Sequence, residues 1–141
     1  MAGALIALAI KNPALAVPLA FASHFFLDVI PHFGVPPGEF VAKKFFKYLA
    51  ADIILALSSL TAMILLFPHK AGIIFVCMAA AVSPDIVWAF YIKELEANDR
   101  KSLDPVTRFH WKIQTKEFLR GIFIEGLLNV IFWLVILIHY R

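Results

Sequence analysis

The strongest constraint in this sequence is a series of long apolar stretches separated by short polar ones. A helix needs about 20 mostly apolar residues to cross a bilayer. Stretches of about this length predict four transmembrane helices, over residues 13–30, 48–67, 71–92 and 118–140. The opening ten residues are also apolar, but they are too few to cross a bilayer alone. We therefore expect an all-α fold, a single membrane domain over residues 1–141, in which about four helices form a bundle with a short N-terminal apolar segment.

The composition supports a membrane protein and excludes other classes. Of the 141 residues, 62% are hydrophobic and 16% are charged, against about 45–50% and about 25% in soluble domains. A small soluble domain of this composition would expose a large apolar surface, and disordered chains are poor in apolar residues. A single cysteine excludes an internal disulfide framework, and a net charge of +3 is too small and scattered for nucleic-acid binding.

Basic residues predict the orientation of the bundle. The two loops at 31–47 and 93–117 carry nine lysines and arginines, whereas the opposite side carries three. Because short basic loops remain in the cytoplasm, we expect both loops to be cytoplasmic and both termini to lie outside.

The second of these loops contains a predicted amphipathic helix at 105–117. Asp104 and Pro105 are typical of a helix start, and apolar residues then recur at helical spacing on one face. We expect this helix to lie on the inner membrane surface. Three basic residues four apart would contact anionic headgroups there: Arg108, Lys112 and Lys116.

Ionisable residues within the predicted spans indicate a functional site, because charge is expensive to bury in a bilayer. His24 and Asp28 lie one helical turn apart in the first span, and His32 follows it. The later spans contain Asp52, Asp85 and Glu125. At about 1.5 Å per residue, the four carboxylates lie within roughly 11 Å of the same membrane boundary. Pro84 is expected to bend its helix and turn Asp85 inward.

This group of residues predicts a metal site. Several carboxylates cannot stay ionised together at low dielectric without compensation, so either some of them are protonated or a cation is bound. Histidines among them favour a transition metal, with zinc as the first candidate and manganese as the alternative. The candidate ligands are His24, Asp28, His32, Asp52, Asp85 and His110. Asp52 or Glu125 would accept a proton in catalysis, and Gln114 and Arg120 would orient ligands or substrate.

Each of these residues also has a structural explanation. His24 and Asp28 can pair within one helix, and Asp52 can extend to the interface. Glu125 and Asn129 can form hydrogen bonds between helices. We favour a single polar site because all of the carboxylates fall at one depth.

Three segments of the chain resemble motifs of one family. Residues 23–32, SHFFLDVIPH, are similar to the S-H-x-x-x-D-x-x-P-H segment of small bacterial and archaeal membrane proteins. These proteins are relatives of the membrane-bound metal-dependent hydrolases. Residues 83–85, SPD, resemble their P-D element, and residues 109–114, FHWKIQ, resemble their F-H-x-x-I-Q element. The order of H-x-x-x-D and P-D differs from that of the larger members. The small members often carry a histidine shortly before the Ala-Gly-Ala that stands here at residues 2–4, where this chain has Met1.

The resemblance implies a metal-dependent hydrolase in the inner membrane of a prokaryote, acting at the level of the cytoplasmic headgroups. The neighbouring basic residues suggest a phospholipid or another anionic amphiphile as substrate. Two alternatives use the same residues: a transporter of protons or metal ions, and a structural or partner-binding membrane protein. Self-association of so small a bundle is left open.

Overall fold

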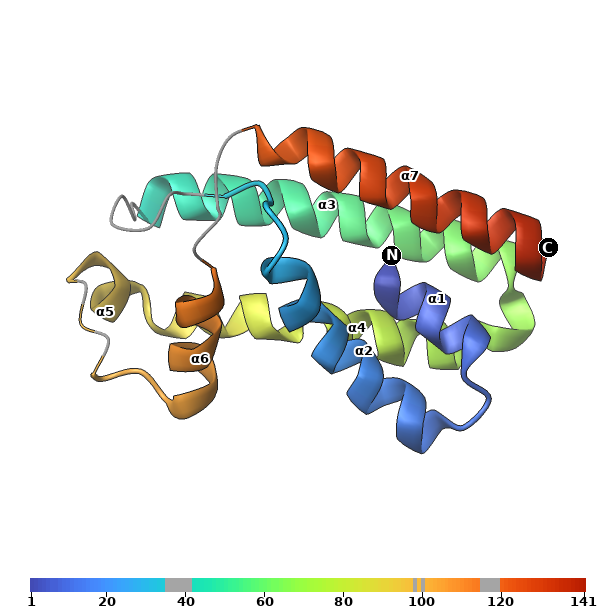
Figure 1. Ribbon diagram of the computed structural model, residues 1–141, viewed down its shortest axis with the longest axis horizontal. Coiled ribbons are helices and arrows are strands. Elements are labelled where there is room, and N and C mark those ends of the chain that lie inside the picture. Colours follow the sequence, from blue (N-terminus) through green and yellow to red (C-terminus); the bar gives the residue numbers. More distant parts are fainter. Residues whose placement is uncertain (35–41, 98, 100, 115–119) are drawn as a thin grey trace.

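The structure is a computed structural model that describes residues 1–34, 42–97, 99, 101–114 and 120–141. Within these residues the regular structure is helical (Figure 1), which confirms the predicted all-α class. The helices in chain order are α1 (Ala2–Ala9), α2 (Pro13–Asp28), α3 (Ala42–Leu66), the 3-10 helix η1 (Pro68–Lys70), α4 (Ala71–Val87), the 3-10 helix η2 (Trp88–Phe90), α5 (Ile92–Glu96), α6 (Pro105–Ile113) and α7 (Gly121–Tyr140).

Three helical stretches are long and apolar enough to cross a membrane. They are Ala42–Leu66, Pro68–Phe90 and Gly121–Tyr140. They correspond to three of the predicted spans, although the first residues of the last predicted span, 118 and 119, lie outside the described residues. α3 begins at Ala42, six residues before the predicted start at residue 48. The lysine-rich residues that precede the predicted span are therefore part of the helix.

The remaining predicted span, 13–30, corresponds to the shorter helix α2. α2 has 16 residues, and at about 1.5 Å per residue it is roughly 24 Å long, less than the hydrocarbon core of about 30 Å. Its start agrees with the sequence, since the Asn12 side chain accepts a hydrogen bond from the Ala14 backbone N–H and Pro13 follows the cap. Among the described residues, three helices therefore have spanning length, and the fourth predicted span forms a shorter apolar helix.

The core lies where α1 and α2 pack against α4. Small residues allow this packing, because they let helix backbones approach closely. Ala4, Ala16 and Ala20 are fully buried. A Cβ atom at Gly3 would lie only 2.6 Å from the carbonyl oxygen of Cys77 in α4. The N-terminal apolar segment therefore folds as a helix inside the core.

α3 and α7 extend along the long axis of the molecule (Figure 1). Both helices expose much of their apolar surface. Leu65, Phe123 and Ile138 are 76%, 77% and 74% exposed. A water-soluble protein rarely exposes such contiguous apolar surface, whereas in a bilayer it faces lipid tails. This exposed surface agrees with the spanning length of the two helices.

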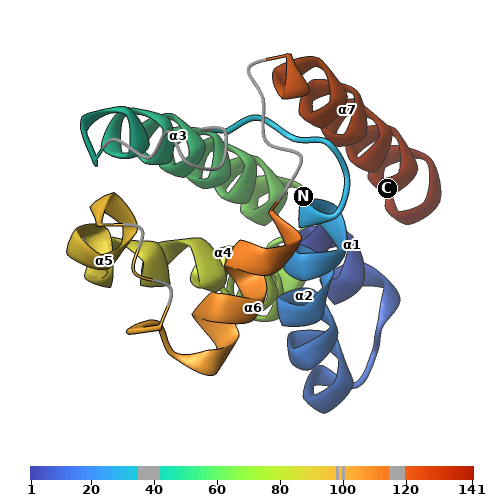
Figure 2. The same ribbon diagram turned by 60° about the vertical axis from the view of Figure 1, so that its left-hand side comes forward.

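α6 lies across the ends of α2 and α4 and contacts both (Figure 2). It begins at Pro105 after the cap Asp104, whose carboxylate accepts hydrogen bonds from the backbone N–H groups of Val106 and Thr107. It ends at Ile113, four residues before the predicted end. Residues 115–117, which include the predicted headgroup contact Lys116, lie outside the described residues. The position of α6 brings a third helix to the ends of α2 and α4.

Candidate metal centre

Two histidines and two aspartates from three helices meet at one point. His24 and Asp28 belong to α2, Asp85 to α4 and His110 to α6. The Nε2 atoms of the two histidines are 3.1 Å apart. Asp28 Oδ2 lies 2.5 Å from His110 Nε2 and 3.2 Å from His24 Nε2. Asp85 Oδ1 lies 3.4 Å from His24 Nε2 and 4.0 Å from His110 Nε2. We call these four residues the His–Asp cluster.

α4 is continuous through Pro84, where the sequence predicts a bend. Pro84 has no N–H to donate to the carbonyl oxygen of Ala80 one turn earlier. The Ser83 hydroxyl donates a hydrogen bond to that oxygen over 2.9 Å, so the freed carbonyl has a partner. α4 therefore continues through Pro84 to Val87 and holds Asp85 beside α2.

Aromatic rings enclose the imidazole of His110. The ring centroid of Trp88 lies 5.0 Å from that of His110, and the centroid of Phe25 lies 5.4 Å from it. Phe25 also contacts His24, at 5.5 Å between centroids. His110 is 1% exposed. This packing fixes both rings with their Nε2 atoms facing the carboxylates.

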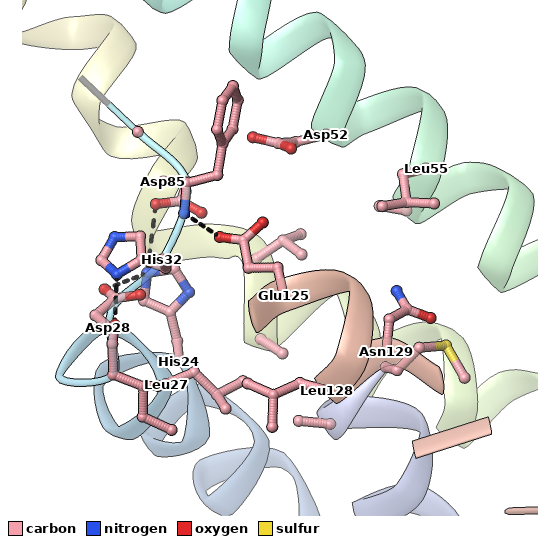
Figure 3. A pocket seen from close by; sticks show the side chains of 18 of the residues that line it. His24, Leu27, Asp28, His32, Asp52, Leu55, Asp85, Glu125, Leu128 and Asn129 are labelled. Atoms are coloured by element: carbon pink, nitrogen blue, oxygen red, sulfur yellow. Dashed lines mark hydrogen bonds and ion pairs between the residues drawn. The ribbon is translucent and has the colours of Figure 1, made fainter. Parts of the chain in front are cut away.

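The cluster forms one wall of a cavity of about 660 Å³ (Figure 3). His24, Asp28 and Asp85 line this cavity. His24 and Asp28 are 8% exposed, whereas the Asp85 side chain is 44% exposed. The volume lies within the range of about 300–1,000 Å³ that is typical of small-molecule sites. The cluster is thus closed on the side of His110 and accessible on the side of Asp85.

Four more of the predicted site residues line the same cavity. They are His32, Asp52, Gln114 and Glu125. Figure 3 shows Asp52 and Glu125 pointing into the cavity from α3 and α7, helices that do not contribute to the His–Asp cluster. Arg120 precedes α7, is exposed and is not among the residues that line this cavity. The structure therefore brings four of the six predicted ligands into contact and places His32 and Asp52 on the surrounding wall.

Glu125 fixes the segment that follows α2. Its Oε1 atom accepts a hydrogen bond from the backbone N–H of Phe33 over 2.9 Å. One turn earlier, Gly121 lies against the backbone of His32 and Phe33, where a Cβ atom would clash. The first turn of α7 is therefore held at the rim of the cavity.

Three residues of the cluster could hold a metal ion. His24, Asp85 and His110 each offer a ligand atom, and these atoms lie within 4.8 Å of one another. With zinc–ligand bonds of about 2.0–2.2 Å, the atoms of a tetrahedral site lie roughly 3.3–3.6 Å apart. The distances among these three residues are 3.1, 3.4 and 4.0 Å, close to this range. Asp28 is joined to His110 by a direct hydrogen bond of 2.5 Å. Two imidazole nitrogens with carboxylate oxygens are a donor set that suits zinc better than calcium or magnesium.

Sequence reasoning did not find the aromatic residues of this site. Phe25 and Trp88 pack on the cluster histidines, and Tyr48 and Phe33 line the cavity in contact with each other. Trp88 was available from helical spacing, since it follows Asp85 by three residues. Phe33 could not be placed in this way, because it lies beyond Pro31 and outside any helix.

Comparison of the chain with family models, with curated proteins and with solved structures returns no match. The resemblance to the membrane-bound metal-dependent hydrolases therefore stays a prediction from the sequence motifs.

Proposed function

We propose that this protein is a membrane-embedded, metal-dependent hydrolase of the membrane-bound metal-dependent hydrolase type. The observation that carries the proposal is the His–Asp cluster, four metal-ligating side chains from three helices on the wall of a cavity. A divalent metal, zinc in the first instance, would be held by His24, Asp28, Asp85 and His110. When bound, it supplies Lewis-acid activation of a water molecule and of the scissile bond.

The remaining polar residues of the cavity have distinct roles in this proposal. Glu125 and Asp52 are the carboxylates that can accept a proton from the attacking water. The hydrogen bond from Phe33 orients Glu125 for this role. His32 and Gln114 line the cavity and would orient ligands or the polar part of the substrate.

The proposed membrane placement follows from charge and exposure. We propose that α2 enters the bilayer as a fourth, short span and that the lysine-rich start of α3 and the 93–117 loop face the cytoplasm of a prokaryotic cell. α6 would lie at the interface, since Val106 and Phe109 are each 52% exposed while Thr107 and His110 point to the protein. Arg108 and Lys112 would then contact anionic headgroups.

The experiment that tests the proposal is a measurement of bound metal by mass spectrometry, on protein purified in mild detergent without chelator or an affinity metal. We expect about one equivalent of zinc or manganese in the wild type and less than a tenth of that in His24→Ala and Asp28→Ala. His69→Ala removes a histidine from η1, outside the cluster, and should keep the wild-type metal content. Gel filtration identifies variants that have lost their fold.

A positive metal result leads to a screen of phospholipids and phosphoesters with the metal-loaded protein. Hydrolysis that is lost in both cluster variants and retained in His69→Ala would establish the enzyme. A wild-type protein that neither contains metal nor takes it up on titration would contradict the proposal, and the cluster would then act as a hydrogen-bonded junction of α2, α4 and α6.

A second candidate function is transport of protons or metal ions. It is favoured by polar residues that continue the cavity beyond the carboxylates, namely Asn129, one turn after Glu125, and the buried Ser59, two turns after Asp52. Metal-dependent flux into proteoliposomes, in the absence of any hydrolysis, would support this function over the hydrolase.

A further inference from the structure

Carboxylates are the most numerous ionisable side chains in the lining of the cavity beside the His–Asp cluster. Four of them line it: Asp28, Asp52, Asp85 and Glu125. Among the described residues that line it there is no lysine or arginine, and the basic side chains are the imidazoles of His24 and His32. Asp28 and Asp85 belong to the His–Asp cluster, and a bound metal would offset their charge. Asp52 and Glu125 belong to α3 and α7 and point into the cavity, where their charge would face any bound ligand (Figure 3).

Two aromatic rings lie close to Asp52 and Glu125, which we call the outer carboxylates. Tyr48 lies one helical turn before Asp52 on the same face of α3. Its ring contacts that of Phe33, with the centroids 4.7 Å apart. The Phe33 backbone N–H in turn donates to Glu125. The rings and the carboxylates are therefore one connected group on the cavity wall.

Aromatic faces combined with carboxylates are the chemistry that recognises ammonium groups. A cation is attracted to the face of an aromatic ring, and the attraction grows when the site is partly shielded from water. An anionic headgroup at the same place would meet like charges, which selects against it. The remaining lining of the cavity includes the apolar residues Leu55, Met78 and Leu128, which can contact a hydrocarbon chain.

We propose that the cavity binds a zwitterionic amphiphile whose headgroup ends in an ammonium group, with that group placed at Tyr48, Phe33 and Asp52. The acyl chain would lie along the apolar lining, and the ester or phosphate linkage would face the His–Asp cluster. This assignment of a substrate class rests on the proposed hydrolase, and it replaces the anionic substrate that the basic loops suggest. Because Asp52 then binds the ammonium group, Glu125 is the carboxylate that remains to accept a proton during hydrolysis.

Binding to chelator-treated protein tests this inference without any need for catalysis. The protein in maltoside micelles is titrated with two lysophospholipids of equal chain length, one with an ethanolamine headgroup and one with a glycerol headgroup. Binding is followed by tryptophan fluorescence, since Trp88 and Trp111 line the cavity. We expect the ethanolamine lipid to bind about tenfold more tightly than the anionic glycerol lipid, which corresponds to about 1.4 kcal/mol.

Substitutions then locate the headgroup site. Asp52→Asn and Tyr48→Leu should each reduce the preference for the ethanolamine lipid at least threefold. Glu94→Gln removes a carboxylate that does not line the cavity and should keep the wild-type preference. Equal binding of the two lipids by the wild type, a preference for the anionic lipid, or a preference that survives both cavity substitutions would overturn the inference.

The metal content of the same samples before chelation separates this inference from the proposed function. Asp52→Asn lies outside the His–Asp cluster and should keep its metal. A protein with metal but without headgroup preference contradicts only the assignment of the substrate class. A protein with headgroup preference but without metal contradicts only the hydrolase.

Discussion

At the scale of the residue, His110 is the side chain on which the site depends most. It is 1% exposed, and its Nε2 atom lies 2.5 Å from Asp28 and 3.1 Å from His24. A buried carboxylate that loses its partner is strongly destabilising, because its desolvation is no longer compensated. His110 is therefore both a candidate metal ligand and the residue that joins α6 to α2.

We expect chelation to lower the stability of the wild type through loss of a ligand that binds only the folded state. At a metal concentration about 100 times the Kd, binding adds about 2.7 kcal/mol to the free energy of unfolding. In a chain of this size the melting temperature should then fall by roughly 5–10 °C when chelator is added. His110→Ala should show little or no such shift in thermal unfolding followed by circular dichroism.

Asp85→Ala provides a test in a variant that should fold, since the Asp85 side chain is 44% exposed. Its chelator-induced shift should also be much smaller than that of the wild type. An unchanged shift in this folded variant would place the metal elsewhere.

Ser83 is a second residue with a specific structural role, because it compensates for the missing hydrogen bond at Pro84. Ser83→Ala leaves the Ala80 carbonyl without this donor, and we expect a loss of about 1–3 kcal/mol in the free energy of unfolding. Ser58→Ala is the matched control. The Ser58 hydroxyl also donates to a carbonyl one turn earlier, but in a helix that contains no proline. Equal losses in the two variants, measured by thermal unfolding, would contradict this role of Ser83.

At the scale of the element, the N-terminal cap of α6 controls how firmly His110 is presented. The Asp104 carboxylate accepts hydrogen bonds from Val106 and Thr107. Asp104→Ala should destabilise α6 by about 1 kcal/mol. This loss should weaken metal binding severalfold, as measured by competition with a chelator, while Asp104→Asn should retain most of the affinity.

The cap also predicts a pH dependence. Hydrogen bonds from Thr107, through its side chain and then its backbone, hold the pKa of the Asp104 carboxyl below its usual value of 3.8. Because the folded pKa is lowered, this stabilisation is present above the usual carboxyl pKa and is lost as the pH falls through the folded value. The stability advantage of the wild type over Asp104→Asn should therefore persist at neutral pH, begin to decrease below about pH 4 and vanish only below the lowered folded pKa. A constant difference from pH 7 to pH 3 would contradict it.

The contact between α1 and α4 depends on the absence of a side chain at Gly3. A Cβ atom there would lie 2.6 Å from the carbonyl oxygen and 2.9 Å from the carbonyl carbon of Cys77, and the backbone cannot move aside locally. Gly3→Ala should therefore separate the two helices and reduce the free energy of unfolding by about 1–3 kcal/mol. Gly72→Ala is the matched control, because nothing lies within 4 Å of its added Cβ atom and alanine favours a helix by up to about 1 kcal/mol. A Gly3→Ala variant as stable as Gly72→Ala would show that α1 is not closely packed.

At the scale of the whole molecule, the proposed orientation can be tested by labelling. The single cysteine, Cys77, is buried, and Cys77→Ala provides a background without reactive thiols. In this background, a membrane-impermeant maleimide applied to intact cells should label His69→Cys and not Lys101→Cys. Both positions are exposed. His69 lies in η1 just before α4, and Lys101 lies beyond α5, which follows the other end of α4. The reverse labelling pattern would invert the proposed topology.

The sequence by itself predicts the membrane class and most of the helices, because hydropathy and helix caps act over a few neighbouring residues. Asn12 with Pro13, and Asp104 with Pro105, mark helix starts that the structure confirms. The ends of α2 and α6 were predicted too late. α2 stops at Asp28, ahead of Pro31, and α6 stops at Ile113, where no single residue of the sequence marks an end.

The sequence also contains the candidate ligands, but only the tertiary structure decides which of them meet. His24 and His110 are 86 positions apart, and their contact depends on how α6 crosses α2 and α4, which no local pattern encodes. Asp52 is expected from its depth in the bundle either to bind the metal or to accept a proton. The structure places it on the cavity wall and outside the His–Asp cluster, because depth along a helix does not fix the direction in which a side chain faces. The residue types and their depth are thus properties of the sequence, whereas their convergence is a property of helix packing.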